Sequence, residues 1–125
     1  MKKSEFKQAV HALLDKPVEG LDWERKVAFV HQILVEMDKE RAAWDQSRKM
    51  QPWSDDELRL ILQLPPTKAN ILRLARAFRR GYGSIEQIYR WAATPKKIIE
   101  AKGRSDDRFI QQIKRIASEV GWRAS

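Results

Sequence analysis

The chain has 125 residues, of which 42% are hydrophobic and 34% are charged, so it can form a packed core and is not a disordered segment. It contains no cysteine, which excludes disulfides, thiolate metal sites and cysteine nucleophiles and fits a reducing compartment. No run approaches the roughly 18 apolar residues of a membrane span, and no apolar leader follows the basic start. We therefore expect a soluble, cytoplasmic protein with no membrane partner.

The formal net charge of +8 is concentrated in the second part of the chain. Residues 1–50 carry 10 Lys and Arg against 9 Asp and Glu, whereas residues 51–125 carry 15 against 8. A positive field so localised attracts polyanions. A solvated surface that only keeps the chain in solution is the alternative interpretation, and we expect a nucleic acid as the partner.

Residues 1–50 are expected to form two helices. Ser4 is a good N-cap for the first helix, which Pro17 and Gly20 end. Its apolar stripe consists of Phe6, Val10, Leu13 and Leu14. Asp22 caps the second helix, which is expected to continue to about Arg48.

The second helix carries residues spaced alternately by four and by three. These residues are Trp23, Val27, Val30, Leu34, Met37, Arg41 and Trp44. A seven-residue repeat of this kind, broken here at Arg41, is typical of a coiled-coil dimer. Because Phe29 and Ile33 widen the apolar face, we expect packing on the first helix and on the C-terminal part of the chain. A homodimer or another protein partner bound through residues 23–44 is the alternative.

Five further helices are expected in residues 53–122. The first begins with a capping box of Ser54 and Glu57, flanked by a hydrophobic staple of Trp53 and Leu58, and it ends before Pro65. The next covers residues 67–80, and its apolar stripe of Ile71, Leu74, Ala75 and Phe78 lies across from a row of five cations. These cations are Lys68, Arg73, Arg76, Arg79 and Arg80.

The last three helices are short and have separate start signals. Ser84 and Gln87 predict a capping box for the first of them. Thr94 and Pro95 open the second, which Gly103 closes. Ser105 caps the third, which continues to Gly121, and Trp122 is expected to fold back onto the core. Since no segment alternates like a strand, the fold should be all-α with about seven helices, divided into residues 1–50 and 53–122.

This order of helices and turns resembles the tandem helix-hairpin-helix domain of DNA-binding proteins. The resemblance covers about residues 54–120. It rests on Leu74, Phe78, the GSIEQI segment at 83–88, Ala93, Thr94, Ile98, Ile99, Gly103 and Ile113. The resemblance implies that small hairpin residues let the backbone approach a phosphate, and that amides at the following helix start point at it. Binding of this kind is largely independent of base sequence.

The two hairpins of the resemblance differ. The second reads Gly103-Arg104-Ser105, with Arg104 in place of an aliphatic residue and with Lys102 and Arg108 adding charge. The first reads LPPTK at 64–68, where proline has no N–H to offer. We therefore predict a DNA contact from the second hairpin and the basic helix. The predicted nucleic-acid-binding residues are Lys68, Arg73, Arg76, Arg79, Arg80, Lys102, Gly103, Arg104, Ser105 and Arg108.

The sequence predicts a binding protein and not an enzyme. His11 and His31 lie on different helices, and no phosphate-loop or dinucleotide motif is present, so we assign no catalytic residue, metal or cofactor. Tyr82 is a surface candidate for stacking on an unpaired base, whereas Trp91 is assigned to core packing. The leading hypothesis is low-specificity contact with the DNA backbone, and binding should weaken with salt at a log–log slope of about −4 to −6.

Two other functions stay open. One is an adaptor within a replication, recombination or transcription complex, which the prolines of the first hairpin favour. The other is a three-helix regulator that reads bases with the helix containing Gln87 and Arg90. The sequence leaves open whether the DNA is duplex, branched or single-stranded, and whether the chain is an oligomer.

Overall fold

A computed structural model describes residues 1–122 of the chain. These residues form seven helices and no strand, which confirms the predicted all-α fold. The helices are α1 Lys3–Asp15, α2 Trp23–Arg41, α3 Asp55–Leu62, α4 Lys68–Phe78, α5 Tyr82–Ala93, α6 Lys96–Ala101 and α7 Arg108–Glu119. None of the described helices is long and apolar enough to cross a membrane.

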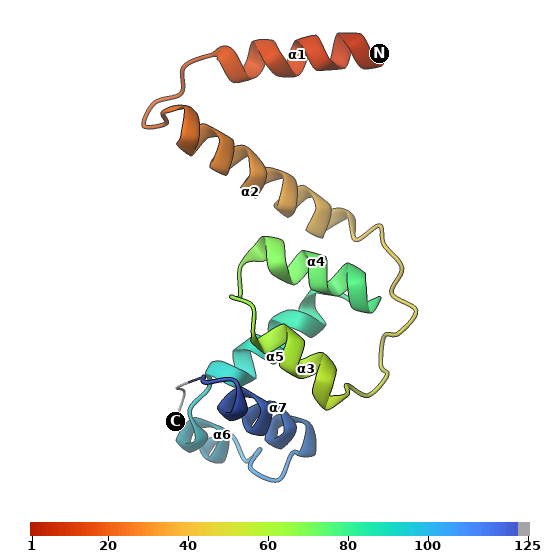
Figure 1. The fold of residues 1–125 in the computed structure, drawn as a ribbon, viewed down its shortest axis with the longest axis vertical. Coiled ribbons are helices and arrows are strands. Elements are labelled where there is room, and N and C mark those ends of the chain that lie inside the picture. Colours follow the sequence, from red (N-terminus) through yellow and green to blue (C-terminus); the bar gives the residue numbers. More distant parts are fainter. Residues whose placement is uncertain (123–125) are drawn as a thin grey trace.

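The hydrophobic core lies between four helices of the C-terminal part, α3, α4, α5 and α7 (Figure 1). The helix α5 packs against both α4 and α7, and α3 packs against α7. The largest fully buried side chains are Leu58, Ile61, Ile85, Ile88, Ile113 and Ile116. Each of these residues belongs to an apolar face with helical spacing, so the core follows from the periodicity of α3, α5 and α7.

Two aromatic side chains close the core at the C-terminal end of α3. The buried Tyr89 hydroxyl donates to the carbonyl oxygens of Ile61 (2.7 Å) and Leu64 (3.1 Å). The Trp122 indole Nε1 donates to the Leu62 carbonyl at 2.7 Å, which confirms that this residue folds back. These donors bind carbonyls in the last turn of α3 and just beyond it, and the Ile61 carbonyl also accepts from the Leu64 amide at 3.1 Å.

The starts of α3 and α4 are found where they were predicted. Ser54 and Glu57 form the capping box of α3, with the Ser54 hydroxyl accepting from the Glu57 amide at 3.1 Å. Thr67 caps α4 by accepting from the Asn70 amide at 3.1 Å.

Five predicted helix ends are wrong. The N-cap of α1 is Lys2, and not Ser4. The helix α2 stops at Arg41 and not near Arg48, because Ala42 adopts the left-handed conformation (φ 46°). Gly81, and not Ser84, is the N-cap of α5.

The other two errors are the starts of α6 and α7. Pro95, and not Thr94, is the N-cap of α6, and the carboxylate of Asp107, and not Ser105, caps α7.

The two N-terminal helices lie to one side of this core. The helix α2 packs on α4, as predicted, and α1 lies beyond α2 on the side away from α4 (Figure 1). No residue of α1 is buried. The predicted packing of α2 on α1 is thus reduced to their connection, where the Lys26 ammonium donates to the carbonyls of Leu14 and Lys16 at 2.8 and 2.6 Å.

Candidate nucleic-acid interface

The cations of α4 face acids supplied by α2 and the segment that follows it. Lys68 Nζ lies 3.0 Å from Glu36 Oε1, and Arg76 Nη2 lies 3.0 Å from Asp38 Oδ1. The pairing lowers the pKa of Glu36 and raises that of Lys68. Because α2 packs on α4, much of the positive charge of this helix is neutralised by the same chain.

The other two exposed arginines of this row differ from each other. Arg79 Nε is 3.9 Å from Asp45 Oδ2, and the residue itself adopts the left-handed conformation (φ 56°) that ends α4. Arg73 is exposed, and within the described chain it has no ion pair. The predicted outward row of five cations is therefore reduced to one unpaired arginine.

Arg80 is not a surface residue, which corrects its assignment as a DNA contact. Its side chain is 2% exposed and donates to the carbonyls of Gln51 and Pro52. Its guanidinium carbon lies 3.8 Å from the centroid of the Trp53 ring. Arg80 therefore fastens the segment before α3 to the end of α4, and it is unavailable to a phosphate.

Tyr82 is also buried, 7% exposed, so it is not the stacking residue that the sequence favoured. The half-buried Trp91 is instead the aromatic residue beside the basic turn. Its ring centroid lies 5.5 Å from Lys102 Nζ and 5.8 Å from Arg104 Cζ. Both distances are within the range of a cation–π contact.

The second turn has the expected glycine but not the expected amide geometry. Gly103 adopts φ +70°, a conformation that glycine favours. The Asp107 carboxylate accepts from the Ile110 amide at 3.0 Å and from Arg104 Nη2 at 2.9 Å, and these contacts lower its pKa. An acid thus occupies the start of α7, where the resemblance implied a phosphate, so contacts at this turn must come from side chains.

A cluster of exposed cations surrounds this turn, and we call it the α6–α7 basic cluster. It consists of Lys96, Lys97, Lys102, Arg104 and Arg108. Within the described chain only Arg104 has an acid partner. The prediction missed Lys96 and Lys97, although their adjacency on a short helix after Pro95 was a usable signal.

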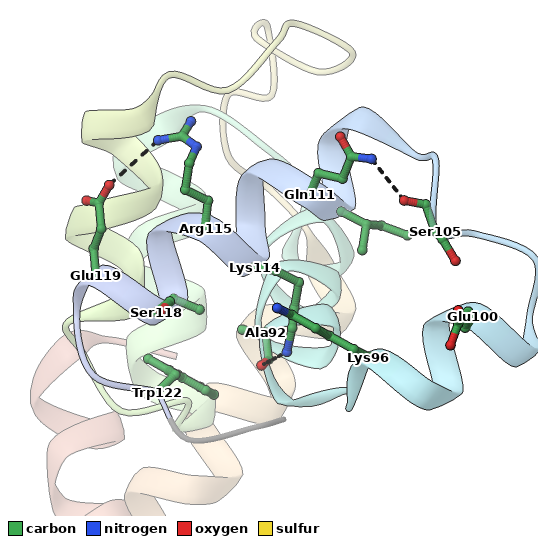
Figure 2. Close-up of a pocket in the computed structure, with 12 residues that line it drawn as sticks. Ala92, Lys96, Glu100, Ser105, Gln111, Lys114, Arg115, Ser118, Glu119 and Trp122 are labelled. Carbon is green, nitrogen blue, oxygen red and sulfur yellow. Dashed lines mark hydrogen bonds and ion pairs between the residues drawn. The ribbon is translucent and has the colours of Figure 1, made fainter.

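A groove of about 990 Å³ lies between α6 and α7 next to the basic cluster. Figure 2 shows Lys96 extending from α6 toward Lys114 on α7. The Lys114 ammonium donates to the carbonyls of Ala92 and Thr94 at 3.0 and 2.8 Å. Burial lowers the pKa of Lys114, and the neighbouring charge of Lys96 lowers it further. Two ammonium groups therefore converge on one wall of the groove.

The described residues offer no cluster of three His, Asp or Glu side chains able to hold a metal ion. His11 and His31 are both exposed and lie on different helices. The groove is lined by the cations Lys96, Lys114 and Arg115 together with the acids Glu100 and Glu119.

Comparison with known proteins gives two matches. The family model described as the uncharacterised protein PM1205 C-terminal domain matches residues 47–124. The chain is 50% identical over 118 residues to the uncharacterised protein PM1205 of Pasteurella multocida (strain Pm70), covering 93% of this chain and 94% of that protein. No solved structure matches the chain.

Proposed function

Since this chain belongs to the family of the uncharacterised protein PM1205, we propose its function from its own geometry: it binds the sugar-phosphate backbone of DNA, without catalysis, through the α6–α7 basic cluster. The observation that carries the proposal is that four of the five cluster cations are exposed with no acid partner in the described chain. Unpaired ammonium and guanidinium groups at one end of a rigid core are suited to phosphates.

Two further features support this location. The Lys96 and Lys114 ammonium groups converge in the adjacent groove, and Trp91 offers an aromatic face beside Lys102 and Arg104. Contacts of this kind go to phosphates and to base faces, so affinity should depend little on base sequence. The absence of cysteine supports a cytoplasmic location for this activity.

The test is a fluorescence-anisotropy titration with a labelled duplex at several salt concentrations. If four to five phosphates are neutralised, log affinity should fall against log salt with a slope of about −3.6 to −4.5. Junction and single-stranded probes of equal length would determine the preferred form of the DNA. A flat salt response would contradict the proposal.

A pair of double variants with equal charge change locates the site. Lys102→Glu with Arg108→Glu should weaken binding at least tenfold, because two attractive contacts with phosphates are replaced by two repulsive ones. Arg25→Glu with Lys49→Glu, at exposed positions outside the cluster, should change affinity less than threefold. Equal losses in the two variants would mean that net charge, and not the cluster, causes binding.

The adaptor hypothesis is retained as the second candidate because α1 and α2 expose large apolar side chains. A complex made through apolar surface should survive high salt, whereas the DNA complex should not.

A further inference from the structure

The N-terminal helices carry most of the exposed apolar surface of the molecule. Of the 14 large apolar side chains exposed among residues 1–122, ten lie within residues 1–37. The 13-residue α1 has no buried residue, and an isolated helix of that length is marginally stable in water. Exposed apolar surface of this extent marks an interaction site.

Trp23, Leu34 and Met37 of the repeat in α2 stay exposed after the chain has folded, whereas Val27 and Val30 are half-buried. The residues of α2 that line its groove with α4 are Ala28, His31, Gln32, Val35 and Asp38. At about 100° per residue, Leu34 and Met37 lie roughly 100° and 160° around the helix from Val35. Accordingly Trp23, Leu34 and Met37 are 61%, 55% and 44% exposed. We call Trp23, Val27, Val30, Leu34 and Met37 the α2 stripe.

We propose that the α2 stripe packs against the α2 stripe of a second copy of this chain, with the two helices antiparallel. Charge favours a second copy over a nucleic acid at this surface. Residues 1–41 contain 8 Lys and Arg and 8 Asp and Glu, whereas residues 42–125 contain 17 against 9. Residues 1–41, which we call the neutral arm, therefore neither attract a polyanion nor repel the same residues of a second copy.

The order of the stripe residues determines the direction of pairing. With the two-fold axis near Gln32, Val27 meets Met37 of the second copy and Val30 meets Leu34. Trp23 then meets Arg41, so the one break in the repeat becomes a cation–π contact. A parallel pair would place Arg41 beside Arg41.

The residues that flank the stripe agree with this register. Lys26, whose ammonium also donates to the carbonyls of Leu14 and Lys16, lies opposite Glu40 of the second copy, and symmetry repeats the pair. Ile33 lies opposite Ile33, which extends the apolar contact. Glu24 comes near Asp38, whose charge is already compensated by Arg76 at 3.0 Å.

The helix α1 enlarges the interface. The five positions of the α2 stripe are few for a coiled coil. A stable protein complex buries about 1,200–2,000 Å² of accessible surface in total. Phe6, Val10 and Leu13 form an apolar stripe on α1, and they are 61%, 38% and 65% exposed. Since α1 joins α2 at the Lys26 end, these side chains can cover the seam on both sides of the symmetric pair.

The mass in solution tests the proposal. Sedimentation of the full chain without nucleic acid should show twice the monomer mass of 14.7 kDa, and Leu34→Glu should return it to the monomer mass with its helicity retained. Leu60→Glu is the matched control, because Leu60 is 52% exposed on α3, and it should stay dimeric. A wild-type chain that stays monomeric as its concentration rises would overturn the proposal and leave another protein as the occupant.

A single cysteine tests the direction of pairing in a chain that has none of its own. Ile33→Cys should form an intermolecular disulfide on oxidation, because the antiparallel register brings the two positions together. In a parallel pair these positions lie on opposite sides of the seam. Leu60→Cys is the control, and efficient cross-linking there with none at position 33 would overturn the register. The result does not depend on DNA binding, so the two proposals can fail separately.

Discussion

Arg80 shows how one residue can join two segments of this fold that are distant in the sequence. Its guanidinium holds the carbonyls of Gln51 and Pro52 and lies over Trp53, while its own carbonyl accepts from Trp44 Nε1 at 2.7 Å. The segment between α2 and α3 is thereby attached to the end of α4. An arginine in a row of surface arginines has no sequence signal that separates this role from DNA binding.

The first prediction concerns the planar shape of this group. Arg80→Lys keeps the positive charge but removes the fork that holds two carbonyls, so it should lower the free energy of unfolding by about 2 kcal/mol. Urea denaturation followed by circular dichroism measures the change. Arg73→Lys, at an exposed position on the same helix, should have no effect, and equal losses would contradict the role assigned to Arg80.

Tyr89 gives the fold a sensitivity to alkaline pH. Burial raises the pKa of its hydroxyl to about 12, from about 10 in an unfolded chain. Because the folded pKa is the higher one, the stability that depends on the neutral hydroxyl is fully present below about pH 10. It is lost as the pH rises from about 10 toward 12.

The second prediction follows from this loss of stability at high pH. At pH 8 the variant Tyr89→Phe should be less stable than the wild type by about 1 kcal/mol, because the Ile61 and Leu64 carbonyls lose the hydroxyl that they share. The difference should shrink as the pH rises from 9 to 11. Urea denaturation across this range measures it, with Tyr82 unchanged in both proteins. A constant difference would contradict the assignment.

At the scale of the element, the backbone is strained at the C-terminal end of α4. Arg79 adopts φ 56° at the C-terminal end of the helix, a position where glycine is usual. Arg79→Gly should therefore raise the free energy of unfolding by about 0.5–1 kcal/mol, since the left-handed conformation costs a residue with a side chain. Thermal denaturation measures the change. Arg73→Gly, inside the same helix, should lower stability by about 1 kcal/mol.

The helix ends also show what the sequence could predict. The starts of α3 and α4 were correct, because Glu57 completes a capping box with Ser54 and because no other capping residue stands beside Thr67. The start of α7 was wrong, because Ser105 and Asp107 compete within three residues and the carboxylate is the observed cap. The end of α2 carried no signal, since the repeat continues to Trp44 while the chain turns at Ala42.

The candidate site was predictable only in part for a related reason. Spacing places Lys68, Arg73 and Arg76 on one face of α4, but the partner of that face is decided by tertiary packing. The acids of α2 that meet it, Glu36 and Asp38, are distant in the sequence. By contrast, the cations after Pro95 lie close together in the chain itself, so the α6–α7 basic cluster can be identified without the fold.

At the scale of the whole molecule, charge and apolar surface are separated. The neutral arm of α1 and α2 carries exposed apolar side chains, and the entire net charge of +8 comes from residues 42–125. The sequence predicted this division in charge, but it did not show that α1 would have no intramolecular neighbour. If both proposals hold, one dimer presents two basic clusters, so a second contact with the same DNA becomes intramolecular and strengthens binding.

The attachment of α1 has a mechanical consequence. The Lys26 ammonium holds the end of α1 through two carbonyls, and no residue of α1 is buried. A change in the orientation of α1 about residues 16–22 would therefore break these two hydrogen bonds and leave the hydrophobic core intact.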